Sequence, residues 1–569
     1  MKEIELTIEP RRLKIISLVG ILIAILLVEI IYPWNTPINF GDEGYHTILI
    51  QWLSDKKEFP VWFPYFSNEI MKGGVTGAYL YHLTTSGLMP FGFQEGLLRF
   101  IVPFYAILTG LVVFAFAKLI FNENVGWFAA IILVTFPSFV TYSIFFYRDA
   151  FFTFYLTVFF LTFILSIKEN NKKYWLLSGV FGAFAIFSKT AGFGLLFFVA
   201  FAFLYEIFTE KKFFQTLKNY LIWLFVLILV LALPYLRNVY YYKSFCYYPY
   251  YPSLFDKIPL LNNKGCAIDL HEEKYRFEGR VEKIGTEANV FTIGLTSYLE
   301  FAYGNLFIIF FPFLTGVFLL YSWKKKTDTL ILLILLSFIL IFYVSTGRAE
   351  DTARYTLGWA PIIALVASTW FDETNKFLNK YYKYLGSTVF LIVLIYSIWG
   401  LKFLGINGYG FLDRIFGWNE IQGGRSIHHY GLLDIRQFSP LFFDACKWAK
   451  EKLPENARLM TIWCYRAAYH CQRNMTGNIP DITLSKDLNT ILQTAKAYGI
   501  THIFIQKFSV DPTNKHFSEH YDLEFVEFLE ANPEHFKNVY ENGPSLQECR
   551  LNWQRGYQCD GNIIYEIIY

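Results

Sequence analysis

Two adjacent carboxylates, Asp42 and Glu43, stand in the string FGDEGYH, directly after the first long apolar stretch of the chain. Adjacent carboxylates at a membrane surface can act as a general base or bind a cation. The simpler interpretation is a solvated turn that caps the next helix. Asp149, in the string YRDAFF, opens a later apolar stretch and could be a helix N-cap paired with Arg148. Each carboxylate is therefore a candidate for chemistry that also has a structural alternative.

Basic side chains also stand between apolar stretches, where charge is costly. Lys189 lies in the string FSKTAG between two such stretches, and Arg348 and Arg354 lie in the string GRAEDTARY. A cation in such a place needs an anionic partner. That partner could be a neighbouring carboxylate in an ion-pair cluster, or the phosphate of a bound ligand. The residues themselves leave both alternatives open.

The elements that must position these groups are membrane spans. Of the 569 residues, 54% are hydrophobic and only 17% are charged, whereas an average soluble domain is about 25% charged. Many apolar runs reach about 18 residues, which is the length that crosses a bilayer. We predict an α-helical polytopic membrane protein with about eleven transmembrane helices. The expected spans are 13–33, 97–120, 124–143, 149–167, 174–188, 190–208, 217–236, 298–321, 328–346, 356–371 and 384–403.

Basic residues in the short connections orient these spans. They cluster in alternate connections, as expected for the cytoplasmic side of a membrane protein. The positions are Arg11, Arg12, Lys14, Lys168, Lys172, Lys173, Lys211, Lys212, Lys324, Lys325, Lys326, Lys376, Lys380 and Lys383. The amino terminus is then cytoplasmic, and a transmembrane domain covers residues 1–404 with outside loops at 34–96, 237–297 and 347–355. The tail, residues 405–569, and the candidate residues then share the outer side.

All seven cysteines lie in segments assigned to the outer side. An oxidising compartment there permits disulfides. Nearness in the sequence predicts the pairs Cys246–Cys266, Cys464–Cys471 and Cys549–Cys559 and leaves Cys446 free. Connectivity cannot be deduced from spacing alone. A zinc site is the alternative, but the sequence holds no CxxC motif.

The end of the tail alternates helix-like and strand-like pieces. Residues 441–453 have an amphipathic helical pattern, and residues 487–498 are helix-like and end at Gly499, a typical C-cap residue. Strand patterns cover 458–463, 501–506 and 562–569. We predict a small extracytoplasmic α/β domain.

Together, these groups on the predicted outer side could support one reaction. Carboxylates can activate a hydroxyl, cations can hold a phosphate leaving group, and the bilayer can deliver a lipid-borne reactant. That combination describes transfer of a sugar from a polyprenyl phosphate. A transporter would place charges near the bilayer midplane and show repeat symmetry, and neither is evident; a receptor with the tail as binding module is a further alternative. The 50 Lys+Arg against 47 Asp+Glu give no indication of nucleic-acid binding.

The order of the motifs resembles the membrane glycosyltransferases of the GT-C class, in particular the branch with dolichyl-phosphate-mannose protein mannosyltransferases and the lipid A aminoarabinose transferase. The matching strings are FGDEGYH, GAYLYHLTTSGLMPFG, EGLLRF with Arg99, YRDAFFTF, GVFGAFAIFSKTAGFG and ARYTLGWAP, and the match with its flanking spans covers roughly residues 13–370. Each string alone is weakly specific, and the ordered set is more so. The chain departs from the family in three places. The family's Pro after Arg-Tyr is displaced to Pro361. The usual Pro-Pro of the first loop is replaced around Tyr81-His82, and the WWDYG signature of oligosaccharyltransferases is absent, with IWCYR at 462–466 as its nearest counterpart.

The resemblance implies a GT-C fold and an inverting transfer from a polyprenyl or dolichyl phosphate sugar, as in the mannosyltransferases, to a protein, lipid or surface-glycan hydroxyl. It implies Asp42 as general base, Glu43 as its helper and Asp149 as a group that holds the acceptor or supports the first loop. The implied donor phosphate-binding residues are Lys189, Arg354, Arg348 and Tyr355, and the acceptor-positioning residues are His46, Tyr81 and His82. No metal is required, although a divalent cation is compatible, and an oligosaccharyltransferase-like enzyme is the alternative. The composition, rich in Ile, Lys, Phe and Tyr with only five Met, favours a prokaryotic source, so the expected location is a prokaryotic cell membrane.

Overall fold

The computed structural model describes most of the chain. The described residues are 16, 18–27, 41–61, 64–65, 79–136, 139, 142–143, 146–210, 213–242, 311–323, 325–344, 357–382, 385–386, 388–389, 392, 417–422, 425–430, 440–462, 464–507, 510–511, 521–554 and 559–569.

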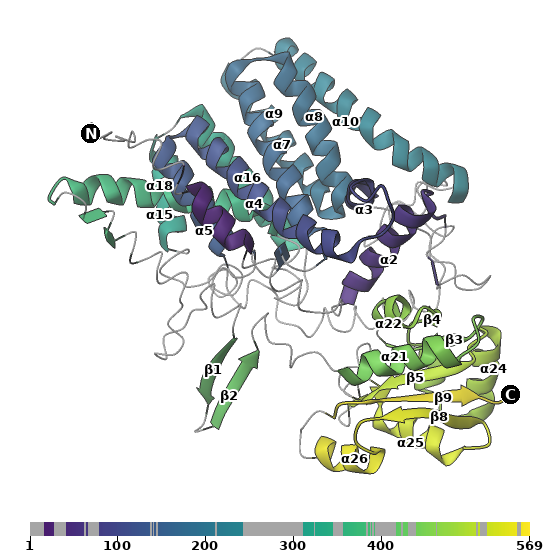
Figure 1. The fold of residues 1–569 in the computed structure, drawn as a ribbon. Helices are drawn as coiled ribbons and strands as arrows, with labels where there is room; N and C mark the ends of the chain where they lie inside the picture. Colours follow the sequence, from purple (N-terminus) through teal and green to yellow (C-terminus); the bar gives the residue numbers. More distant parts are fainter. Residues whose placement is uncertain are drawn as a thin grey trace, which may run out of the picture.

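A bundle of apolar helices forms one part of the molecule (Figure 1). Its elements are α4 (Glu95–Ile120), α5 (Glu123–Thr135), α7 (Asp149–Glu169), α8 (Lys172–Ser188), η1 (Thr190–Gly194), α9 (Leu195–Glu210), α10 (Phe213–Tyr242), α15 (Phe311–Trp323), α16 (Lys326–Val344), η5 (Leu357–Trp359) and α18 (Ala360–Asn379). Among the described residues, four helical segments are long and apolar enough to cross a membrane, namely Glu95–Ile120, Asp149–Glu169, Ala191–Glu210 and Phe213–Tyr241. All four coincide with predicted spans. The predicted total of about eleven is not tested, because 298–310 and 393–403 lie outside the described residues.

The hairpin of α7 and α8 brings two candidate residues to the same level. The turn is short because α7 ends at Asn170, which has a left-handed φ of 47°, and Asn171 caps α8 by accepting from the backbone N–H of Lys173 at 2.9 Å. Two antiparallel helices joined by such a turn lie side by side, so the end of the second returns to the start of the first. Asp149 opens α7 and Lys189 follows α8. The short turn therefore brings the side chains of Asp149 and Lys189 close together.

The tail is an α/β domain around one mixed sheet (Figure 1). Its strands run in the order β4-β3-β5-β9-β8, with β3 parallel to β4 and β5, and β9 antiparallel to β5 and β8. The strands are β3 (Arg458–Met460), β4 (Asn474–Thr476), β5 (His502–Gln506), β8 (Phe536–Asn542) and β9 (Asn562–Ile567), and the helices are α21 (Pro440–Lys452), α22 (Cys464–Cys471), α23 (Pro480–Thr483), α24 (Leu488–Ala497), α25 (Leu523–Ala531) and α26 (Leu546–Gln554). Two further short pairs are β1 (Gly417–Gln422) with β2 (Arg425–Tyr430), which stands apart from this sheet in Figure 1, and β6 (Val510–Asp511) with β7 (Tyr521–Asp522). The predicted helices and strands of this segment are present, although β3 is shorter than expected.

A helix from the loop predicted at 34–96 is built into the core of the tail. This helix, α2 (Gly41–Lys56), lies beside α22, with α3 (Tyr79–Gly87) on its other side toward the bundle (Figure 1). Its Ile48 and Leu49 are fully buried in the same hydrophobic cluster as Phe442 of α21 and Phe504 of β5. Burying such a side chain contributes roughly 1.5–3 kcal/mol, as an upper estimate. The tail and the loop that carries the acidic pair therefore share one core.

The structure corrects part of the disulfide prediction. Cys549 pairs with Cys559, as nearness suggested. Cys446 pairs with Cys471, at a Cα–Cα distance of 4.2 Å, so Cys471 is not joined to Cys464. The predicted Cys464–Cys471 pair and the free Cys446 are therefore wrong. Cys464 and Cys471 stand at opposite ends of α22, about 10 Å apart along its axis, which exceeds the reach of a disulfide. The pair Cys246–Cys266 lies outside the described residues.

Replacing the two cysteines of α22 should have unequal effects. Cys471→Ala removes the cross-link between α21 and α22 and should lower the free energy of unfolding by about 2–4 kcal/mol, whereas Cys464→Ala should change it by less than about 0.5 kcal/mol. Thermal unfolding of the two purified variants measures the difference. Mass spectrometry of non-reduced peptides provides the control, because a peptide joining Cys464 to Cys471 would contradict the assignment.

Candidate active site

The acidic pair opens α2, where the bundle and the tail meet. Glu43 is buried, and its carboxylate accepts a hydrogen bond from the backbone N–H of Phe146 at 3.0 Å. Asp42 precedes it in the first turn of the helix, and its side chain lies outside the described part of the structure. The helix amino terminus favours negative charge at both positions. Glu43 is therefore not a solvated turn residue but a buried carboxylate tied to the segment before α7.

Asp149 and Lys189 form a buried ion pair. The Lys189 ammonium contacts the Asp149 carboxylate, and the two residues are 1% and 0% exposed. Lys189 thus has the anionic partner that its position in the sequence demanded. Asp149 is the first residue of α7 and Arg148 its N-cap position, without a side-chain capping bond. The pair fixes a positive and a negative charge in one water-poor site.

Tyr81, His46 and His82 fill the space between α2 and α3. His46 Nδ1 lies 2.9 Å from His82 Nε2, and the Tyr81 ring contacts both imidazoles edge-on. Tyr81 is 0% exposed, and its hydroxyl has no hydrogen-bond partner among the described residues. Burial raises the pKa of Tyr81 well above its usual value, and the nearby Glu43 and Asp149 carboxylates raise it further. The Tyr81 hydroxyl is therefore neutral.

The tail contributes an arginine to this cluster. Arg466 of α22 is 7% exposed, and its guanidinium lies 3.7 Å from the centre of the Phe442 ring. Burial lowers the pKa of Arg466 to about 9, while Asp560 and Glu43 act in the opposite direction. The group is therefore a cation at neutral pH. Arg466 was not among the predicted site residues, because its only signal in the sequence is its place in IWCYR, the counterpart of a motif that this chain lacks.

A second contact joins α22 to the bundle. The Tyr469 hydroxyl donates to the Glu95 carboxylate at 3.2 Å, and the same carboxylate pairs with the Arg99 guanidinium one turn further along α4. Arg99 also lies 5.3 Å from the centre of the Phe146 ring, next to the backbone group that Glu43 accepts from. Arg99, the basic residue expected to open the second span, thus packs against the residue that binds the Glu43 carboxylate.

Three predicted donor-binding residues, Arg348, Arg354 and Tyr355, lie outside the described residues. The structure therefore brings together Glu43, His46, Tyr81, His82, Asp149 and Lys189, whereas three of the four residues of the predicted phosphate site remain a prediction. Within the described part of the chain, no group of three or more His, Cys, Asp or Glu side chains could hold a metal ion.

The contact between α2 and α22 depends on Gly44. A Cβ at this position would lie 2.5 Å from the carbonyl oxygen of Tyr465 and 2.8 Å from the amide nitrogen of Arg466. Both are backbone atoms, so relief requires one helix to move. Only glycine permits this approach.

Gly44→Ala should therefore separate the helices, lower stability by about 1–3 kcal/mol and reduce activity by displacing the acidic pair. Gly87→Ala in α3 is the matched control, because a Cβ there meets nothing within 4 Å. Thermal unfolding of both variants tests the prediction. Equal melting temperatures for the two proteins would contradict the close contact.

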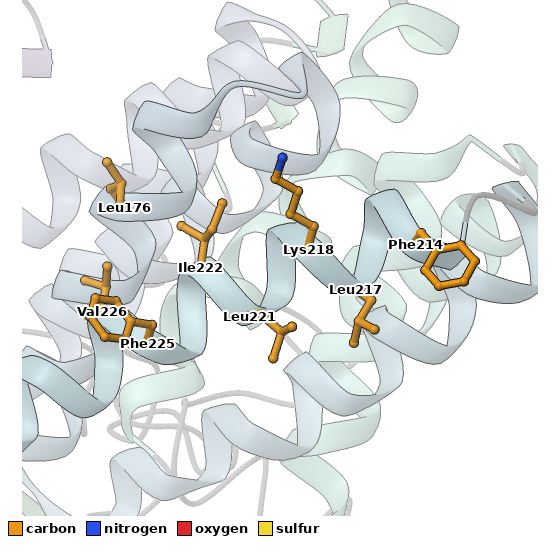
Figure 2. Close-up of a pocket in the computed structure, with 8 residues that line it drawn as sticks. All are labelled: Leu176, Phe214, Leu217, Lys218, Leu221, Ile222, Phe225 and Val226. Carbon is orange, nitrogen blue, oxygen red and sulfur yellow. The ribbon is translucent and has the colours of Figure 1, made fainter.

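A groove on the bundle surface lies far from this cluster. Figure 2 shows its lining on α8 and α10: Leu176, Phe214, Leu217, Lys218, Leu221, Ile222, Phe225 and Val226, around a volume of about 500 Å³. Apart from Lys218 the lining is apolar. Leu176 stands near the start of α8 and Lys189 just beyond its end, which separates them by about 20 Å. The groove is therefore not the place where the polar groups meet.

Comparison with solved structures identifies the fold of this chain. The archaeal oligosaccharyltransferase AglB from Archaeoglobus fulgidus, solved with an inhibitory peptide and a dolichol-phosphate, is similar with a TM-score of 0.65 and 12% identity, over 97% of this chain and 88% of that one. ArnT from Cupriavidus metallidurans, bound to undecaprenyl phosphate, is similar with a TM-score of 0.55 and 10% identity, over 97% of both chains. This protein has the GT-C glycosyltransferase fold. The resemblance seen in the sequence is thereby confirmed at the level of class.

The sequence comparisons agree with the GT-C fold. The family model described as dolichyl-phosphate-mannose-protein mannosyltransferase matches residues 76–236. That stretch contains Tyr81, His82, Asp149 and Lys189, four residues of the buried cluster. Among curated proteins, none matches the sequence.

Proposed function

We propose that this protein is an inverting glycosyltransferase that moves a sugar from a polyprenyl or dolichyl phosphate to an acceptor hydroxyl on the outer face of a prokaryotic cell membrane. The observation that carries the proposal is the buried set of Glu43, Asp149 and Lys189 where the apolar bundle meets the tail. Two proteins of the same fold were solved with polyprenyl phosphates, which supports a lipid-linked donor. The acceptor is a hydroxyl of a protein, a lipid or a surface glycan.

The proposed reaction is a single displacement at the anomeric carbon. The acceptor oxygen attacks that carbon, the bond from it to the phosphate oxygen breaks, and the electron pair leaves with the polyprenyl phosphate. The acceptor proton passes to the Asp42 carboxylate, which supplies the general base. Glu43 and Asp149 orient the acceptor and its loop, and His46, Tyr81 and His82 shape the acceptor side.

Cations stabilise the leaving phosphate in this proposal. Lys189 is in place beside α7, and we assign the same role to Arg348, Arg354 and Tyr355, which lie outside the described residues. Charge-assisted hydrogen bonds from buried cations are strong where water is excluded, and they act most on the charge that develops as the bond breaks. No step requires a metal.

Transfer of a whole oligosaccharide is the second candidate. It is favoured by the similarity to AglB, whose TM-score of 0.65 exceeds the 0.55 for ArnT. The string IWCYR, in place of the WWDYG signature, argues for the transfer of a single sugar. A transporter has no support in the fold.

Transfer by the full-length protein in lipid nanodiscs tests the proposal. A panel of labelled polyprenyl-phosphate monosaccharides, with mannose first, is offered together with hydroxyl-bearing peptides and lipids. We expect labelled acceptor and an equal amount of released polyprenyl phosphate. Transfer only from a pyrophosphate-linked oligosaccharide would favour the second candidate, and no transfer from either donor would overturn both.

Orientation is a separate prediction. The tail holds two disulfides, Cys446–Cys471 and Cys549–Cys559, which form in oxidising compartments, and the basic short connections favour a cytoplasmic amino terminus. A periplasmic-type reporter fused after Tyr569 should therefore be active. A reporter that is active there only in the cytoplasm would reverse the topology, and the same reporter placed in the connection at 211–212 serves as the opposite-side control.

A further inference from the structure

Arg466 is a buried arginine of α22, the helix of the tail that packs against α2 and its acidic pair. Its Nε is buried without a hydrogen-bond partner among the described residues. A guanidinium carries five donors, and burying a charge is costly unless an anion compensates it. The anions that act on Arg466 are Asp560 of the tail and Glu43 of the acidic pair.

The backbone around Arg466 is also held against the acidic pair. The amide nitrogen of Arg466 and the carbonyl of Tyr465 are the atoms that Gly44 approaches. The Tyr465 ring contacts the Tyr45 ring, with centroids 5.3 Å apart. The residues on either side of Gly44 in α2 are therefore fixed by consecutive residues of α22.

We propose that Arg466 is a positioning residue of the transfer site, through which the tail domain holds the Glu43 carboxylate in place. The proposal rests on the proposed function. Arg466 does not need to touch either substrate. Its charge attracts the Glu43 carboxylate, and Glu43 stands in the first turn of α2 next to Asp42. The Phe442 ring beneath the guanidinium limits its movement. The tail is then part of the catalytic unit rather than an appended module.

A double-mutant cycle tests this coupling. Arg466→Met keeps the apolar stem without the charge, and Glu43→Gln keeps the shape of the side chain without the charge. We expect each variant to lower kcat by about 10- to 100-fold while KM for donor stays within about twofold. The double variant should be no slower than the slower single variant, because residues that act as one unit are not additive. Arg466→Lys should recover part of the loss because it keeps the charge.

Arg458→Met is the matched control, since this half-buried arginine of β3 donates to the carbonyl of Tyr498 at 3.0 Å within the tail. It should lower stability without lowering kcat. Additive losses in the cycle, a loss confined to KM, or a kcat of Arg466→Met equal to that of the wild type would overturn the proposal for Arg466 while leaving transfer itself intact.

Thermal unfolding of the same four proteins gives a readout that needs no substrate. Arg466→Met should destabilise the wild-type background more than the Glu43→Gln background, because the partner charge is already absent in the latter. Equal destabilisation in both backgrounds would overturn the pairing. If the wild type transfers nothing from any donor, the proposed function fails, and this cycle still decides whether Arg466 and Glu43 interact.

Discussion

Asp42→Asn is expected to lower kcat for sugar transfer by about 10²–10⁴-fold, the usual effect of losing a general base. The amide has the shape of the carboxylate but cannot take the acceptor proton. Donor binding should stay close to that of the wild type, because the change removes no group assigned to the phosphate. Single-turnover transfer from a polyprenyl-phosphate sugar, with separate measurement of donor affinity, separates the two effects.

Asp55→Asn provides the matched control for this experiment. Asp55 lies on the same helix, is exposed, and accepts a hydrogen bond from the backbone N–H of Phe93 at 2.9 Å. An asparagine oxygen can still accept that bond, so transfer should change by less than about twofold. Near-normal turnover of Asp42→Asn would remove Asp42 from the role of base and leave Glu43 and Asp149 as the remaining candidates.

The membrane helices were predictable because their signal is local. Runs such as α7 and α10 are apolar over most of their length, and the length that crosses a bilayer is fixed by its thickness. The approach of Asp149 to Lys189 could have been foreseen as well, because a tight turn at Asn170 and Asn171 returns α8 to the start of α7. For such pairs the spacing along the chain and the helix geometry are sufficient.

The contribution of the tail to the site could not be predicted in the same way. Arg466 stands more than four hundred positions beyond Glu43 in the sequence, and its backbone meets α2 only because Gly44 lacks a Cβ. Neither Arg466 nor Gly44 stands in a periodic sequence pattern that would indicate its partner. The disulfide prediction failed for a related reason, since nearness in sequence placed Cys464 with Cys471 although one helix keeps them apart. The packing of α21 on α22 supplies Cys446 instead.

The second large expected effect is the loss of stability when the ion pair of Asp149 and Lys189 is broken. Lys189→Met leaves the Asp149 carboxylate buried without its cation, and breaking a buried ion pair from one side costs about 3–5 kcal/mol. The variant should therefore be strongly destabilised, so a loss of activity in it would not by itself reveal a phosphate ligand. Thermal unfolding of the protein in nanodiscs measures the stability loss.

A neutral double variant resolves this ambiguity. Asp149→Asn combined with Lys189→Met removes both charges, so most of the lost stability should return. If Lys189 also binds the donor phosphate, the affinity for polyprenyl phosphate should stay at least tenfold below that of the wild type in this stable protein. Recovery of donor affinity together with stability would show that Lys189 only braces α7 against α8.

The control for the double variant is a cation at another helix contact of the bundle. Lys326 pairs with Glu206 at 2.9 Å and with Glu210 at 3.0 Å, and it is more exposed than Lys189. Lys326→Met should cost less stability, because partly exposed pairs contribute little, and it should leave donor affinity unchanged. A loss of donor affinity in this variant as well would mean that the measurement reports general loosening of the bundle. The contrast between the two lysines therefore decides whether a charge fixed by the α7–α8 hairpin serves the donor or only the fold.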